Sequence, residues 1–138
     1  MTPYYGTKRI EAKPYNENGV DGYQVRYADG YTSWSPKEAF EAAYRQSGQM
    51  TFGHALEALK AGHKVSRAGW NGPGQFLFLV QGSTFAVNRP PLLGIYNEGA
   101  MINYRPHIDI SLDDGNVATW SPSNGDALAE DWRIVGEE

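Results

Sequence analysis

Apolar residues along this chain follow two spacings, one of two residues and one of three to four. Tyr23, Val25 and Tyr27 alternate with polar residues, which is typical of a strand buried on one face. Residues 76–80 (Phe-Leu-Phe-Leu-Val) form a continuous apolar run that is too short to span a membrane. Such a run predicts a strand covered on both faces, by the rest of the chain or by another subunit.

Turn-forming residues divide the chain into short elements. The expected helices start at a Ser35 cap followed by Pro36, at a Thr51 cap with a stop at Gly62, and within residues 121–124. The expected strands cover residues 7–13, 23–27, 31–34, 64–67, 76–80, 85–87, 101–112 with a break at Pro106, 117–120 and 132–135. We therefore predict an α+β fold with an antiparallel sheet and short helices.

The pattern also predicts two parts. Residues 47–49 (Ser-Gly-Gln) have the composition of a linker. Residues 1–49 are expected to form a small strand-strand-helix module of unknown role, and residues 50–138 a second domain.

Composition excludes several kinds of chemistry. The chain has no cysteine, so disulfides, thiol nucleophiles and cysteine-bound zinc are ruled out. His54 and His63 lie nine residues apart, which is not a metal-ligand spacing, and we predict no metal site. The N-terminal residues have no signal-peptide pattern, so a soluble intracellular protein is expected.

Charge is unevenly distributed along the chain. The net charge is −4, yet residues 60–107 carry five basic side chains against Glu98 alone. An acidic protein is a poor binder of polymeric nucleic acid, because that affinity depends on neutralising many phosphates. Arginines beside a pocket can still hold a small anion, although a solvated surface would give the same pattern.

The glycine-rich turn after residue 67 carries the first candidate site. Trp70 and Asn71 lie in a loop before the rigid 76–80 strand, where loops often hold ligands. An aromatic ring can stack on a nucleobase, and an amide such as that of Asn71 or Asn88 can bind a base edge or ribose hydroxyls. The alternatives are that Trp70 folds back into the core and that the asparagines only form turns.

A second candidate lies on one expected strand face. Arg105, His107 and Asp109 alternate along it, so they could perform acid–base chemistry or orient an anion. A hydrogen-bonded structural pair is the commoner arrangement. No nucleophile elbow or paired-carboxylate spacing is present, which favours binding over catalysis.

Several segments of residues 50–138 resemble one family of small phage proteins. They are Met50-Thr51-Phe52-Gly53, Arg67-Ala68-Gly69-Trp70-Asn71-Gly72, Phe76-Leu77-Phe78-Leu79-Val80, Val87-Asn88-Arg89-Pro90-Pro91-Leu92, Tyr104-Arg105-Pro106-His107-Ile108-Asp109 and Leu128-Ala129-Glu130-Asp131-Trp132. The family is the second described type of Thoeris anti-defence protein. Residues 1–49 are similar to a small module found at the start of various phage proteins.

The resemblance implies a sponge, a protein that binds a signal molecule and withholds it uncleaved. The expected ligand is a glycocyclic ADP-ribose made by Thoeris TIR proteins and, for some members, cyclic di- or trinucleotides. It also implies a homotetramer with ligand pockets between subunits, acting in the cytoplasm of the infected bacterium, with no cofactor and no catalysis. Rival functions are an enzyme that degrades such a signal and a phage structural or adaptor protein.

The resemblance implies a ligand loop at Trp70, Asn71 and Gly72. Further ligand contacts are expected from the other matching segments. These are Asn88, Arg89, Tyr104, Arg105, His107, Asp109, Trp120, Ser123, Asn124 and Asp126.

Overall fold

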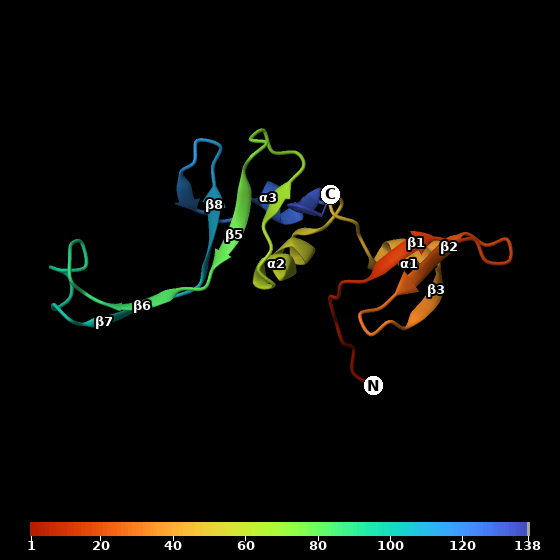
Figure 1. Cartoon of the computed structure of the whole chain (residues 1–138), viewed down its shortest axis with the longest axis horizontal. Helices are drawn as coiled ribbons and strands as arrows, with labels where there is room; N and C mark the ends of the chain where they lie inside the picture. The colour runs from red at the N-terminus through yellow and green to blue at the C-terminus, as the bar shows by residue number, and fades with distance from the viewer. Residues whose placement is uncertain (138) are drawn as a thin grey trace.

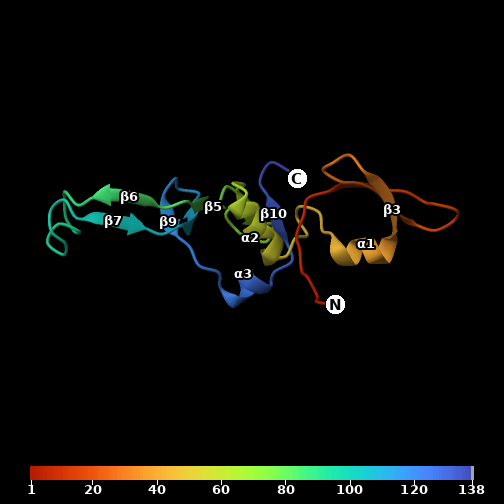
Figure 2. The same cartoon turned by 90° about the horizontal axis from the view of Figure 1, so that it is seen from below.

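A computed structural model describes residues 1–137 of the chain. The molecule is elongated, with three parts in a row (Figure 1). The N-terminal module lies at one end, a five-stranded sheet with its helices lies in the middle, and a two-stranded arm projects at the other end (Figure 2). The prediction of an α+β fold with antiparallel strands and short helices is confirmed.

The N-terminal module is a three-stranded antiparallel sheet with one helix. Its elements are β1 (Glu11–Pro14), β2 (Gly22–Arg26), β3 (Thr32–Pro36) and α1 (Lys37–Ala43), and the strand order is β1-β2-β3. Phe40 of α1 stacks on Tyr23 with 4.1 Å between ring centroids. Val25 and Phe40 are the module's buried apolar side chains among the described residues, so its core is small.

The start of α1 differs from the prediction. Ser35 was expected to cap the helix, but Pro36 occupies the cap position and no side chain caps the helix. The reason is that Ser35 still belongs to β3, where it pairs with Tyr23. The strand predicted over residues 7–13 likewise begins only at Glu11.

The central sheet has the strand order β10-β4-β5-β8-β9. Its strands are β4 (Val65–Arg67), β5 (Phe76–Val80), β8 (His107–Ser111), β9 (Val117–Thr119) and β10 (Trp132–Ile134), and its helices are α2 (Phe52–Lys60) and α3 (Asn124–Leu128). β5 and β8 pair over their whole length, from Phe76 with Ser111 to Val80 with His107. The break predicted at Pro106 is thus confirmed.

Helix α2 starts and ends where the sequence predicts. The Thr51 side chain accepts from the backbone N–H of His54, and the His54 ring contacts the Thr51 backbone in return. Gly62, with φ of +95°, follows the helix, a conformation that suits glycine. The helix places Ala55 and Leu59 in the core, against Val65, Leu77 and Trp132.

The apolar run of β5 serves two faces. Leu77 and Leu79 belong to the core beneath α2, and Leu77 is fully buried. Phe76 and Phe78 point to the opposite face because side chains alternate along a strand, and both are only half-buried there. A single chain therefore covers one face of this strand well and the other incompletely.

The arm extends the central hairpin past a break. It consists of β6 (Ser83–Ala86) and β7 (Met101–Tyr104), which pair antiparallel. At the break, Gly82 has φ of +93°, and a Cβ atom there would collide with the Tyr104 carbonyl oxygen. Residues 88–100 form the loop at the end of the arm, as the two prolines predict.

Residues 47–49, expected to be a linker, are bonded to the edge of the central sheet. The Gly48 N–H donates to the Trp132 carbonyl at 2.9 Å, and Met50 and Trp132 exchange two backbone hydrogen bonds. The Ser47 hydroxyl accepts from the Ile134 N–H at 2.9 Å. This segment thus covers the outer edge of β10.

Within residues 1–137, no helix has both the length and the apolar composition needed to cross a bilayer.

We predict that Ser47→Ala lowers the free energy of unfolding by about 1–2 kcal/mol, because it leaves the Ile134 N–H without its acceptor. Urea denaturation of the full chain measures this loss. Ser121→Ala is the control, since its exposed hydroxyl has no partner among the described residues. Equal stabilities of the two variants would show that the contact between the segment and β10 contributes nothing.

Candidate functional site

Trp70 packs into a cluster of three tryptophans. Its ring meets Trp132 edge-on at 5.5 Å and Trp120 at 6.5 Å between centroids. Trp132 is fully buried, whereas Trp70 remains half-buried. The structure therefore favours the packed alternative for this ring, while Asn71 beside it is exposed to solvent.

An ion-pair network lies beside these three tryptophans, Trp70, Trp120 and Trp132, which we call the tryptophan corner. The Arg67 Nε donates to Asp131 Oδ1 at 2.9 Å, and its Nη1 donates to Asp126 Oδ1 at 3.0 Å. Asp126 also receives a longer bond of 3.4 Å from the Trp70 indole N–H. Asp131 Oδ2 accepts the backbone N–H of Gly69 at 2.9 Å. One guanidinium thus joins β4, α3 and the turn before β10.

The network shifts the pKa values of its members. Burial acts against the charged form of Asp126, but hydrogen bonds from Arg67 and Ser123 outweigh it, so the pKa of Asp126 is lowered. For Asp131, burial is likewise outweighed by hydrogen bonds from Arg67 and Gly69, and its pKa is lowered. The bond to Asp131 raises the pKa of Arg67. The Nε and Nη1 atoms of Arg67 are thus both bound to carboxylates of the same chain.

The residues predicted around α3 mostly support this helix. Asp126 Oδ2 accepts from the Ser123 N–H and hydroxyl, and the Ser123 hydroxyl accepts from the Asp126 N–H in return. The Asp126 carbonyl accepts the Trp132 indole N–H at 3.0 Å. Asn124 begins the helix and is exposed. The polar atoms of Ser123 and Asp126 are thus used in bonds within the chain.

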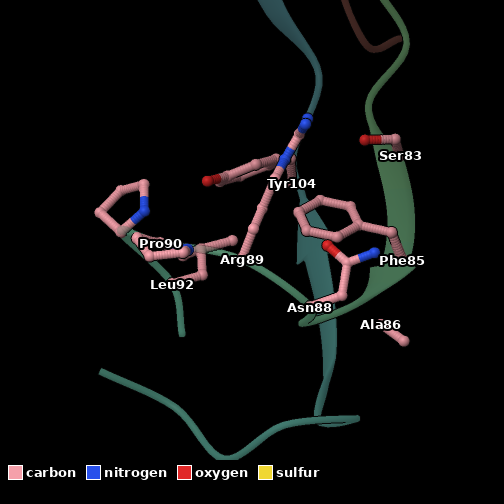
Figure 3. Close-up of a pocket in the computed structure, with 9 residues that line it drawn as sticks. Ser83, Phe85, Ala86, Asn88, Arg89, Pro90, Leu92 and Tyr104 are labelled. Carbon is pink, nitrogen blue, oxygen red and sulfur yellow. The ribbon is translucent and has the colours of Figure 1, made fainter. Parts of the chain in front are cut away.

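A second group of predicted residues lines a groove on the arm. Asn88, Arg89 and Tyr104 meet there with Phe85 and Leu92, in a volume of about 810 Å³ (Figure 3). The rings of Phe85 and Tyr104 lie 5.4 Å apart. Asn88 and Arg89 are exposed, and their side chains make no hydrogen bond or ion pair within residues 1–137. The groove therefore presents one cation and one amide without internal partners, together with two aromatic rings.

The third group lies on β8 and just before it. His107 Nε2 is 3.3 Å from Asp109 Oδ1, and His107 Nδ1 lies 3.2 Å from the Arg105 carbonyl. Asp109 Oδ1 is buried and has no hydrogen-bond partner among the described residues. Both side chains share the sheet face of Phe78, which pairs with Asp109. Arg105 contributes its carbonyl to the pair.

The predicted site residues thus fall into three places in one chain. Trp70, Asn71, Gly72, Trp120, Ser123, Asn124 and Asp126 surround the tryptophan corner; Asn88, Arg89 and Tyr104 line the arm groove; and Arg105, His107 and Asp109 lie at β8. Phe85 and Asp131 were missed by the sequence reasoning. The Glu-Asp-Trp segment before β10 was the available signal for Asp131, whereas nothing in the local pattern marks Phe85.

Within residues 1–137, no group of three or more His, Asp or Glu side chains is arranged to hold a metal ion.

We predict that acid weakens the fold through Asp126 and Asp131. Their folded-state pKa values lie below the ordinary 3.8, so the stabilisation is present above that value and is lost as the pH falls further. Urea denaturation from about pH 5 to about pH 2 should show the free energy of unfolding falling with pH, most steeply below 3.8. Asp131→Asn should be less stable at pH 7 and decline less steeply; parallel curves for the two proteins would contradict this.

Comparison with known proteins shows the family of residues 50–135. The Thoeris anti-defense 2-like domain model matches residues 50–135. A Bacillus phage SP01 protein described as Thoeris anti-defense 2 is 44% identical over 88 residues, which are 63% of this chain and 96% of the relative. The match includes all three groups of predicted site residues and excludes the N-terminal module. The chain therefore belongs to the Thoeris anti-defense 2-like family.

Proposed function

We propose that this protein is a phage anti-Thoeris sponge, which binds a glycocyclic ADP-ribose signal and withholds it without cleaving it. Family membership supports the anti-Thoeris role. The observation that carries the ligand class is the arm groove, where Arg89, Asn88 and the rings of Phe85 and Tyr104 converge.

The groove matches the chemistry of such a signal. A guanidinium binds a diphosphate through charge-assisted hydrogen bonds, and Arg89 makes no internal ion pair within the described chain. Phe85 and Tyr104 offer ring faces for adenine, at about 1–3 kcal/mol per stacked base. The Asn88 amide can serve a base edge or a ribose hydroxyl. Cyclic di- or trinucleotides carry the same groups and are the second ligand class that we propose.

Assembly completes the site in this proposal. A two-stranded hairpin alone is marginally stable in water. The arm is such a hairpin, and it also exposes the apolar side chains of Ile95, Tyr96, Met101 and Tyr104. The half-buried Phe76 and Phe78 add a second incompletely covered face. A homotetramer would cover these surfaces and bring the arm groove of one subunit toward the tryptophan corner of another, where Asn71 is exposed.

The rival function is hydrolysis of the same signal in the host cytoplasm. His107 and Asp109 are the residues that support it, because a carboxylate 3.3 Å from an imidazole can orient it as a general base. A structural or adaptor role is the third candidate, and it requires no small ligand at all. The fate of the ligand separates all three.

We predict that glycocyclic ADP-ribose incubated with excess protein disappears from solution and returns intact after heat denaturation. Mass spectrometry of the supernatant before and after heating measures both steps. A cleaved product that is lost in His107→Ala would establish the hydrolase instead. Ligand that never leaves solution would favour the adaptor role.

We predict that Arg89→Ala weakens binding of glycocyclic ADP-ribose at least tenfold, about 1.4 kcal/mol, because it removes the unpaired cation of the groove. The melting temperature should hardly change, since the side chain is exposed. Calorimetric titration measures the affinity, and Arg26→Ala on the N-terminal module is the matched control. Equal affinities of the two variants would exclude Arg89 from the site.

A further inference from the structure

The loop between β4 and β5 is longer than the connection requires. The two strands pair through Val65 and Leu77, and residues 68–75 join them. Antiparallel neighbours are commonly joined by two to five residues, and longer ordered loops usually present something. With Gly69, Gly72 and Gly74 in it, this loop has little intrinsic stiffness.

Two carboxylates from distant segments hold the loop at its two ends. Asp131 binds the entry, through the Gly69 N–H at 2.9 Å. Asp113, from the turn after β8, binds the exit, where its Oδ1 accepts the Gly74 N–H at 2.8 Å. Each contact joins the loop to a residue that is tens of positions away in the chain.

Glycine is what lets the carboxylates come so close. A Cβ atom on Gly69 would lie 2.8 Å from Asp131 Oδ2. On Gly72 it would lie 2.6 Å from Asp113 Oδ2, and on Gly74 it would lie 2.8 Å from Asp113 Oδ1. Any other residue at these positions would push the acceptor away. The two carboxylate contacts therefore depend on the glycines.

Between the two contacts, the Asn71 side chain has no bonding partner in the described part of the chain. Asn71 is exposed, and its amide makes no hydrogen bond within the described residues. Asp114, next to Asp113, bonds only within its own turn, to the N–H and the amide of Asn116. The Asp113 side chain, by contrast, bonds outside this turn, to the Gly74 N–H of the loop.

We propose that Asp113 is a positioning residue: with Asp131, it holds residues 69–75 in one conformation, so that the exposed Asn71 is pre-organised for the ligand. The inference rests on the proposed function for the identity of the ligand. It adds to that function the contacts that hold the ligand loop in its binding conformation. Pre-organisation raises affinity because less conformational freedom is lost on binding.

The direction in which an Asp113 substitution changes ligand affinity separates a positioning role from an electrostatic one. A carboxylate close to a diphosphate repels it, so removing the charge alone would tighten binding. Removing a positioning contact weakens it instead. Asp113→Asn keeps an acceptor oxygen but loses the charge, and Asp113→Ala loses both.

The experiment combines calorimetric titration with glycocyclic ADP-ribose and NMR amide hydrogen exchange on the full chain. Asp113→Ala should bind about tenfold more weakly, and its Gly74 amide should exchange at least about tenfold faster. Asp113→Asn should retain most of the affinity and the protection. Asp114→Ala, the control, should change neither.

Tighter binding by Asp113→Ala, unchanged affinity with faster exchange, or an equal loss in Asp114→Ala would overturn the inference. If the wild-type protein fails to bind glycocyclic ADP-ribose, the proposed function fails by itself. Exchange at Gly74 then decides whether the clamp holds the loop: protection unchanged by Asp113→Ala overturns it, and lost protection supports it.

Discussion

The structure depends on one guanidinium shared by two carboxylates. Arg67 at the end of β4 binds Asp126 and Asp131, which lie 59 and 64 residues further along the chain. Without this partner the two half-buried carboxylates would repel each other and lose the donor that offsets their burial. The network also fixes α3 beside Trp132, so the tryptophan corner and the loop above it take their geometry from one residue.

The central sheet and the arm differ in how their polar side chains are paired. In the central sheet, Arg67 is bound to two carboxylates of the same chain through its Nε and Nη1 atoms. On the arm, Arg89, Asn88 and two rings face solvent around a groove. Capture of an anionic, base-bearing molecule needs unspent groups of these kinds on a support that does not move. In the proposed assembly, the arm of one subunit would supply these groups and the loop of another would lie beside them.

Sequence reasoning succeeded where the chemistry is local. The cap at Thr51, the stop at Gly62 and the break at Pro106 each depend on residues within one turn, and the structure has all three. The cap expected at Ser35 was wrong because pairing with Tyr23 overrides the local preference. Division of the candidate residues among corner, groove and β8 depends on where the arm points. That direction follows from the break at Gly82, which no periodicity reveals.

The central claim is that the arm groove and the exposed loop residue Asn71 together receive a nucleotide signal. Backbone amide NMR spectra recorded during titration with glycocyclic ADP-ribose test this most directly. The account predicts concentration-dependent shifts at Asn88, Arg89 and Asn71, with residues of the N-terminal module such as Val25 unchanged. Shifts confined to the N-terminal module, or none at saturating ligand, would contradict it.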